Sequence, residues 1–275
     1  MDGVDLSFWV NPAVGGDSMN SILEEKLNVF LKEHNCKSRI TKGYGMTELS
    51  GTAITSSYNY NKYESVGIPF SKNNVGAFVP GTDEELPYGE IGEICIASPT
   101  MFLGYLNEEE NQYVKKQHKD GNIWIHSQDY GYIDEEGFVF IKGRIKRTLV
   151  RPDGHNNYPM EMESVLNTHP NIADTAVVGL AAEKYGNGQI PIAFVVPRDG
   201  KINEYFEKAL LDYCRKKLPQ RDIPCGIVAI NELPVTNIGK VDHIKLEEQL
   251  NAIISSDAAR REQFYRAYED TLVIR

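Results

Sequence analysis

The chain has 275 residues, 41% of them hydrophobic and 25% charged, which is typical of a soluble globular protein with one large or two ordinary domains. Its formal net charge of −10 disfavours a surface for nucleic acid or anionic membrane, because clustered Lys and Arg bind such partners. No apolar run approaches the ~20 residues that cross a membrane, and no signal peptide is visible, so we expect a cytoplasmic protein without nucleic-acid or membrane partners.

The first half of the chain is predicted to contain one helix, followed mainly by strands. Residues 19–35 should form an amphipathic helix, capped by Asn20 or Ser21, because apolar side chains recur there at helical spacing. A strand and a glycine-containing loop should follow at residues 39–51. Short apolar runs separated by Gly and Pro after residue 64 then predict a small antiparallel β subdomain. Its strands are expected at residues 91–97, 122–126 and 138–141.

The pattern changes after Gly143 and Arg144, where strands and helices begin to alternate within short segments. Such alternation is typical of a compact α+β domain, so we place a boundary between residues 144 and 145. The expected strands are 145–150, 173–180, 189–196 and 226–230; the expected helices are 159–166, 203–217 and the stretch from 246 to the C-terminus, with a break near 255–257.

A glycine-containing motif covers the point where the first predicted strand gives way to a loop. Glycines let a backbone approach a ligand, a tyrosine offers a flat face to a heterocycle, and Thr47 and Glu48 can bind a phosphate and a Mg²⁺ ion. An ordinary glycine-rich turn explains a motif this short equally well. Its residues are Gly43, Tyr44, Gly45, Met46, Thr47 and Glu48, followed by Gly51.

Two further candidates lie around the predicted domain boundary. Asp129 follows a strand pattern, and a carboxylate in that place can bind the vicinal hydroxyls of a ribose, although a solvated loop aspartate is the commoner alternative. Gly143 and Arg144 suit a hinge, and Arg144 can pair with a phosphate or ribose oxygen. A basic strand edge is the alternative there.

Lys240 stands on a predicted tight loop near the C-terminus, beside Gly239. A lysine in that place can put a positive charge on a developing phosphoryl or acyl-phosphate oxygen. An ordinary exposed lysine in a turn is the alternative, because most lysines are exposed.

In their order and spacing, these motifs resemble the ANL superfamily, which comprises acyl-CoA synthetases, peptide-synthetase adenylation domains and luciferases. The resemblance covers roughly residues 5–250. The matching segments are Tyr44–Glu48 (Tyr-Gly-x-Thr-Glu), Gly92–Ile94 (Gly-Glu-Ile), Gly104–Asn107 (Gly-Tyr-x-Asn), Ser127–Asp129 (Thr-Gly-Asp in the family), Gly143–Lys146 (the hinge) and Gly239-Lys240, with Gly15-Gly16-Asp17 matching an upstream turn.

The resemblance implies an α/β and α+β fold in two parts. Residues 1–144 would be the C-terminal part of the large AMP-binding domain, with a partial α/β subdomain and a small β subdomain. Residues 145–275 would be the small mobile α+β C-terminal domain with a helical tail. It also implies an AMP-forming ligase: a carboxylic acid attacks the α-phosphate of ATP, and the thiol of CoA or of a carrier protein then displaces AMP. ATP or AMP, Mg²⁺ and CoA would be the ligands.

The resemblance assigns nucleotide contacts to the first part of the chain. Tyr44 would stack near the adenine, and Asp129, helped by Arg144, would bind the ribose hydroxyls. Thr47 would bind the α-phosphate and Glu48 would bind Mg²⁺. The loop glycines Gly43 and Gly45 complete this set.

Lys240 would stabilise charge during adenylation, Lys146 would be the hinge between the domains, and Gly154 would line the path of the pantetheine. Both Asp and Lys occur at the hinge position in the family. The candidate residues of the acyl pocket are Gly15, Gly16, Met46 and Gly51.

The chain departs from the family in the composition of one motif and in length. Gln128 replaces the glycine of Thr-Gly-Asp, which restricts φ there. Nothing in the chain matches the family's Ser/Thr/Gly-rich phosphate loop, and members are roughly twice as long. We therefore expect a shortened form that is inactive alone and able to self-associate. A carrier-protein-loading enzyme and a non-catalytic nucleotide-binding module are the alternatives; the acid and the oligomeric state stay open.

Overall fold

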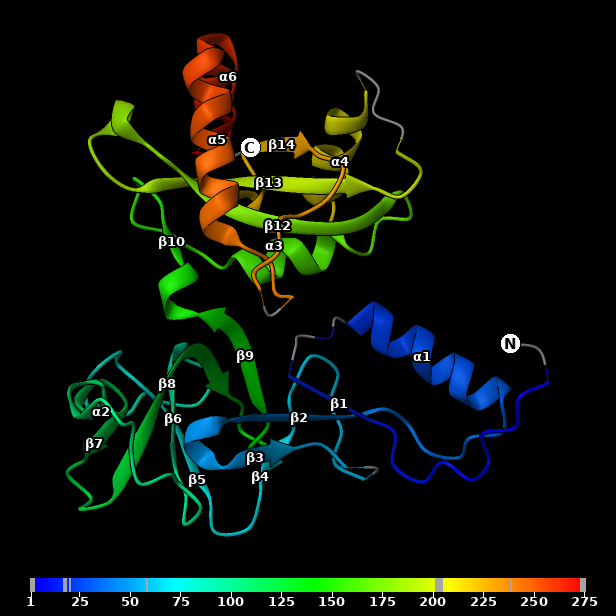
Figure 1. The fold of residues 1–275 in the computed structure, drawn as a ribbon, viewed down its shortest axis with the longest axis vertical. Helices are drawn as coiled ribbons and strands as arrows, with labels where there is room; N and C mark the ends of the chain where they lie inside the picture. The colour runs from blue at the N-terminus through cyan, green and yellow to red at the C-terminus, as the bar shows by residue number, and fades with distance from the viewer. Residues whose placement is uncertain are drawn as a thin grey trace. The chain divides into compact units, whose positions relative to one another are not determined.

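The computed structural model describes residues 3–16, 19, 21–57, 59–200, 205–237 and 239–272. The chain divides into two compact units, Met1–Lys146 and Arg147–Arg275, which are described separately (Figure 1). The division falls two residues after the predicted boundary at Arg144.

The first unit begins with a small mixed sheet and one helix. Helix α1 connects two parallel strands, and its Leu31 packs on Cys36 and Ile40. A buried ion pair of 2.5 Å between Glu24 and Lys42 also joins this helix to the sheet. The predicted helix is thereby confirmed. Of its two proposed caps, Asn20 lies outside the described residues, and Ser21 is the first residue of the helix itself. The sheet order is β1 (Ala13–Gly15), β2 (Thr41–Met46), β3 (Gly51–Thr55) and β4 (Ile68–Pro69), with α1 at Ser21–Glu33.

A second, antiparallel sheet forms the rest of the first unit, as predicted. Apolar side chains such as Ile94, Ile125 and Val139 are fully buried and form its core. The order is β5-β6-β8-β7, and β9 also pairs with β8. The strands are β5 (Asn74–Phe78), β6 (Gly92–Ala97), β7 (Lys115–Gln117), β8 (Ile123–Ile133) and β9 (Val139–Arg144), with helix α2 at Glu108–Val114.

The second unit is a three-stranded sheet covered by helices on both faces, which confirms the expected α+β pattern (Figure 1). Neighbouring residues of a strand point to opposite faces. Val177 therefore packs with α3 and α4, whereas Val178 packs with α5 and α6. The elements are β12 (Ile172–Ala181), β13 (Gln189–Pro197), β14 (Gly226–Ala229), α3 (Pro159–Leu166), α4 (Phe206–Arg215), α5 (His243–Ser256) and α6 (Ala258–Leu272).

The strand predicted at residues 145–150 is wrong. Ile145–Arg147 form a 3-10 helix, and only β10 (Leu149–Val150) pairs, with β11 (Asn156–Asn157). Helix α3 begins at Pro159, two residues after Asn157, so β11 offers no partner to the residues before Leu149.

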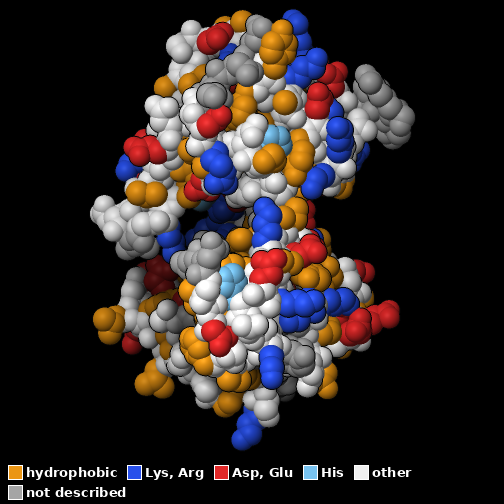
Figure 2. All heavy atoms as spheres, turned by 90° about the vertical axis from the view of Figure 1, so that its right-hand side faces the viewer, with side chains coloured by type: hydrophobic (Ala, Val, Ile, Leu, Met, Phe, Trp, Pro, Cys, Tyr) orange, Lys and Arg blue, Asp and Glu red, His pale blue; other side chains and the backbone are white. Residues whose placement is uncertain are grey.

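Two surface properties bear on the predicted partners. Within the described residues, no helix combines the length and the apolar content needed to cross a bilayer. On the face shown in Figure 2, basic side chains are interspersed with acidic ones.

Candidate functional site

The loop after β2 has a geometry that explains its glycines. The strand runs into a 3-10 helix at Thr47–Leu49, and the chain returns into β3 through Ser50, whose φ is 58°. A Cβ at Gly45 would lie 2.0 Å from the carbonyl oxygen of Gly51, so the two strands approach more closely than any other residue permits.

A groove of about 670 Å³ opens beside this loop within the first unit. The loop leaves Thr47 exposed, and Phe70 contributes an aromatic wall. Predicted residues from two separate segments line the groove: Gly15, Gly16, Gly43, Gly45, Met46, Thr47 and Gly51. Their placement in one cavity is compatible with a ligand-binding role.

Tyr44 and Asp129, which lie 85 residues apart, meet in a second cluster. The Tyr44 hydroxyl donates a hydrogen bond to one carboxylate oxygen of Asp129, and Arg144 Nε lies 3.1 Å from the other. Strand pairing brings Arg144 to Asp129, because Asp129 on β8 is the register partner of Arg144 on β9. The three side chains therefore come from three strands that the fold holds together.

Burial dominates the electrostatics of this cluster. Asp129 is only 6% exposed, and its burial raises the pKa of the carboxyl, while the Tyr44 hydroxyl and the Arg144 charge act in the opposite direction. Burial, followed by the negative charge of Asp129, raises the pKa of Tyr44 well above its usual value. Tyr44 is thus a neutral donor, and each carboxylate oxygen of Asp129 keeps a lone pair for a further donor.

Glu48 has one partner that the sequence did not suggest. The hydroxyl of Tyr105 donates to Glu48 Oε1, and burial together with this carboxylate raises the pKa of Tyr105 to about 12. The half-buried carboxylate keeps its second oxygen, and Thr47 is its chain neighbour. One carboxylate oxygen suits Mg²⁺, which usually takes one or two carboxylates and completes its shell with phosphates and water.

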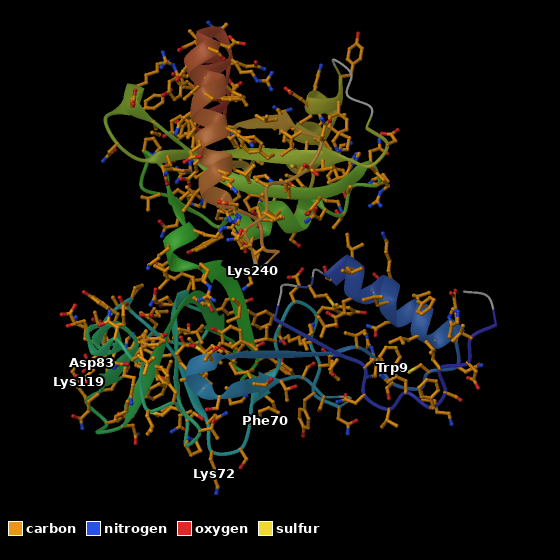
Figure 3. The ribbon with its side chains drawn as sticks, in the orientation of Figure 1. Trp9, Phe70, Lys72, Asp83, Lys119 and Lys240 are labelled. Atoms are coloured by element: carbon orange, nitrogen blue, oxygen red, sulfur yellow. The ribbon has the colours of Figure 1, made fainter. Side chains whose placement is uncertain are left out.

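The second unit presents its predicted residues on turns. Lys240 is exposed on a loop in which Thr236 N donates to Lys240 O at 2.7 Å (Figure 3). Gly154 has a φ of 79° in the turn between β10 and β11. Lys146, the last residue of the first unit, is exposed in the 3-10 helix at Ile145–Arg147.

Comparison with known proteins places this geometry in a family. Residues 4–106 match the AMP-binding enzyme family, and residues 161–240 match the AMP-binding enzyme C-terminal domain. The chain belongs to the ANL superfamily of adenylate-forming enzymes.

Curated relatives of this ANL chain are acyl-CoA ligases. It is 35% identical over 247 residues to the putative acyl-CoA ligase YdaB of Bacillus subtilis, covering 89% of this chain and 46% of that protein. It is 37% identical over 246 residues to the probable 4-coumarate-CoA ligase 1 of Dictyostelium discoideum, covering 88% and 42%. The chain thus spans about half the length of the curated relatives it matches.

Solved structures of CoA ligases match the fold over most of the chain. The anthranilate CoA ligase AuaEII in complex with anthranoyl-AMP matches with a TM-score of 0.76 and 25% identity, over 91% of this chain and 45% of that one. The O-succinylbenzoate CoA synthetase of Bacillus subtilis in complex with ATP and magnesium matches with a TM-score of 0.72 and 27% identity, over 86% and 46%.

The departure from the ANL motif at Gln128 has a structural counterpart. Gln128 has a φ of 59°, the left-handed region that glycine adopts without a penalty. This chain therefore keeps the backbone conformation that suits the family's glycine while carrying a side chain there.

Three residues of this neighbourhood escaped the site prediction: Tyr105, Glu93 and His126. Tyr105 and Glu93 stood in the motifs that carried the family resemblance, but no role followed for either. A carboxylate in the otherwise apolar run Ile91–Ala97 was the available signal for Glu93, since acids are rarely buried without a partner.

Proposed function

We propose that this chain supplies the nucleotide-binding part of an AMP-forming acid–thiol ligase. The arrangement of Tyr44, Asp129 and Arg144 supports the proposal, because it presents a buried carboxylate with free lone pairs between an aromatic ring and a guanidinium. Asp129 would accept hydrogen bonds from the two ribose hydroxyls, as acidic residues do in other nucleotide sites.

The reaction would proceed in two steps. A carboxylate oxygen of the acid attacks the α-phosphorus of ATP, the bond to the β-phosphate oxygen breaks, and acyl-adenylate and pyrophosphate form. A thiol sulfur, that of CoA being favoured by the relatives' names, then attacks the acyl carbon, loses its proton and expels AMP.

The residues of this chain would act through charge and hydrogen bonding. Thr47 would donate to the α-phosphate, and Glu48 would hold Mg²⁺, which neutralises phosphate charge when bound. Lys240 would stabilise the charge that develops during adenylation. Lys146 would be the hinge about which the domain that carries Lys240 rotates. In the thiol step, Gly154 would line the pantetheine path.

Two alternatives share the nucleotide site but use the bound nucleotide differently. The adenylate could be passed to a carrier protein in place of CoA, or the chain could bind nucleotide without catalysis. We favour catalysis because Thr47, Glu48, Asp129, Arg144 and Lys240 are all present, whereas a degenerate module would be expected to lose such ligands first.

Calorimetric titration with AMP tests the nucleotide site. We expect the chain to bind AMP more tightly than 2′-deoxy-AMP. Asp129→Ala should weaken AMP binding by roughly 10- to 100-fold and remove the preference, because it deletes charged hydrogen bonds. Asp83→Ala is the matched control, since the half-buried Asp83 also pairs with a cation, the exposed Lys119, at 3.0 Å (Figure 3). Equal affinity of the chain and Asp129→Ala for AMP would refute the assignment.

We further propose that the 275-residue chain does not complete adenylation alone, because its sequence holds no match to the family's phosphate-binding loop. Mixed with ATP, Mg²⁺ and a panel of carboxylic acids, it should release no burst of pyrophosphate. A burst proportional to chain concentration would contradict this.

A further inference from the structure

Asp129 lies in a bulge of β8 that the neighbouring strand β6 does not pair. The register joins Glu93 to Tyr130 and Cys95 to His126, so residues 127–129 lie opposite the single residue Ile94. Bulges beside active sites commonly re-aim a side chain. The direction of Asp129 therefore depends on what keeps this bulge in place.

The centre of the bulge is strained and has lost its strand partner. Gln128 has a φ of 59°, which costs a non-glycine residue about 1 kcal/mol. Its backbone N–H donates instead to Glu93 Oε1 at 3.0 Å. This bond joins the bulge directly to a side chain of β6.

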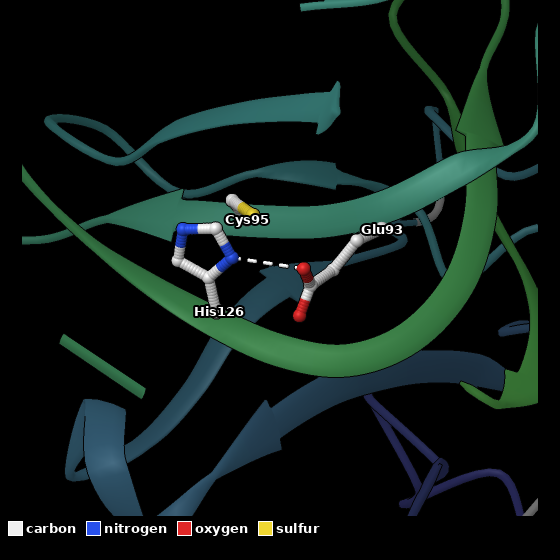
Figure 4. Close-up of side chains that lie close together, drawn as sticks. All are labelled: Glu93, Cys95 and His126. Carbon is white, nitrogen blue, oxygen red and sulfur yellow. Dashed lines mark hydrogen bonds and ion pairs between the residues drawn. The ribbon is translucent and has the colours of Figure 1, made fainter. Parts of the chain in front are cut away.

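Glu93 is itself fixed on its other oxygen. Oε2 accepts a hydrogen bond from His126 Nδ1 at 2.8 Å (Figure 4). The same oxygen accepts another from Gly81 N, also at 2.8 Å. Nε2 of His126 lies 3.0 Å from Nε2 of His118, whose ring stacks on Trp124. Glu93 and His126 are 3% and 1% exposed, so the network has little freedom to rearrange.

We propose that Glu93 is a positioning residue for the nucleotide, whose carboxylate, anchored by His126 and Gly81, fixes the bulge at residues 127–129 and so aims Asp129 at the ribose. The inference rests on the proposed nucleotide site and adds a residue that does not touch the ligand.

A metal site built from Glu93, Cys95 and His126 is the alternative use of this cluster, since their ligand atoms lie within 4.8 Å of one another. The hydrogen bonds argue against it. Both nitrogens of His126 and both oxygens of Glu93 already have partners. Burial also raises the pKa of Cys95, which keeps the thiol protonated and a poor ligand.

Glu93→Gln tests the proposal at nearly constant shape. Three donors converge on Glu93: His126 Nδ1, Gly81 N and Gln128 N. An amide offers one acceptor oxygen and turns its NH₂ group toward the remaining donors. In the full chain we expect AMP to bind about tenfold more weakly or worse, as for a buried donor left unsatisfied.

Gln128→Gly distinguishes positioning from a general loss of stability. Glycine adopts the bulge conformation without strain, so the double variant Glu93→Gln/Gln128→Gly should recover at least half of the lost affinity on a logarithmic scale. Glu163→Gln is the matched control: Glu163 also accepts a backbone N–H, from Val177, and pairs with Arg147, but in the second unit. It should leave AMP affinity within about twofold of the parent.

Hydrogen exchange supplies a readout that does not need the nucleotide. In Glu93→Gln the amides of residues 127–129 should exchange at least tenfold faster, while those of β13 stay unchanged. Unchanged exchange in the bulge, or unchanged AMP affinity, would overturn the proposal, as would a double variant without recovery. A chain that fails to bind AMP refutes the proposed function instead, and the exchange experiment still decides whether Glu93 fixes the bulge.

Discussion

The two units carry their candidate residues in different ways. In the first unit, side chains far apart in sequence make direct contact, as Tyr44 does with Asp129 and Glu48 with Tyr105. In the second unit, Gly154 and Lys240 stand on exposed turns held by backbone hydrogen bonds within a few residues. Side chains that hold one another in place are preorganised to bind a ligand. A side chain on an exposed turn lacks such support, so we expect it to contribute less to ligand affinity.

The largest expected effect tests whether the units are energetically separate. Phe194 is fully buried at the centre of the second unit, so Phe194→Ala should cost about 3–5 kcal/mol and lower the melting temperature of that unit. AMP affinity should stay within about twofold, because the proposed nucleotide site belongs to the first unit. Calorimetric melting combined with AMP titration measures both. A loss of AMP affinity as large as the loss of stability would show that the two units are energetically coupled.

Substitutions of single charged residues in the two units should differ in their effect on AMP affinity. Arg144→Ala should weaken AMP by about tenfold, because it removes the cation beside Asp129. Lys240→Ala should leave AMP affinity unchanged, since we assign Lys240 to the adenylation step. Isothermal titration of both variants gives the contrast. A loss in Lys240→Ala as large as that in Arg144→Ala would show that the lysine contributes to ground-state binding.

The stability of the second unit should fall as the pH is lowered. Burial, and then the charge of Arg147, lowers the pKa of His243 to about 4. The unfolded chain binds this proton near pH 6.5, so between about pH 6.5 and 4 it binds more protons than the folded unit does. Stability is then lost as the pH falls through that window.

Urea unfolding at pH 7 and pH 5 measures this effect. His243→Gln should show a smaller decrease in the free energy of unfolding than the parent chain. The same decrease in both would mean that other groups cause the acid sensitivity.

The smallest effect concerns the bulge. Gln128→Gly relieves a positive φ but increases the freedom of the unfolded chain, so we expect a gain of at most about 1 kcal/mol. Thermal unfolding of the first unit measures it. Destabilisation by a similar amount would mean that the Gln128 side chain makes a compensating contact.

Most of the secondary structure followed from local patterns. Pro159 and the apolar spacing after it predicted a helix over residues 159–166, which is where α3 lies. The strand predicted at residues 145–150 failed over residues 145–148, because a strand needs a pairing partner and β11 ends at Asn157, just before α3.

The family followed from the order of the motifs along the chain, because the spacing of glycines, acids and lysines is a property of the sequence. Which of these residues meet is a different matter. The contact of Asp129 with Tyr44 spans 85 residues and joins two different sheets. The anchoring of Gln128 by Glu93 spans 35 residues and depends on the pairing of β8 with β6. Strand register is fixed by the packing of a whole sheet face, so only the folded chain decides where these side chains lie.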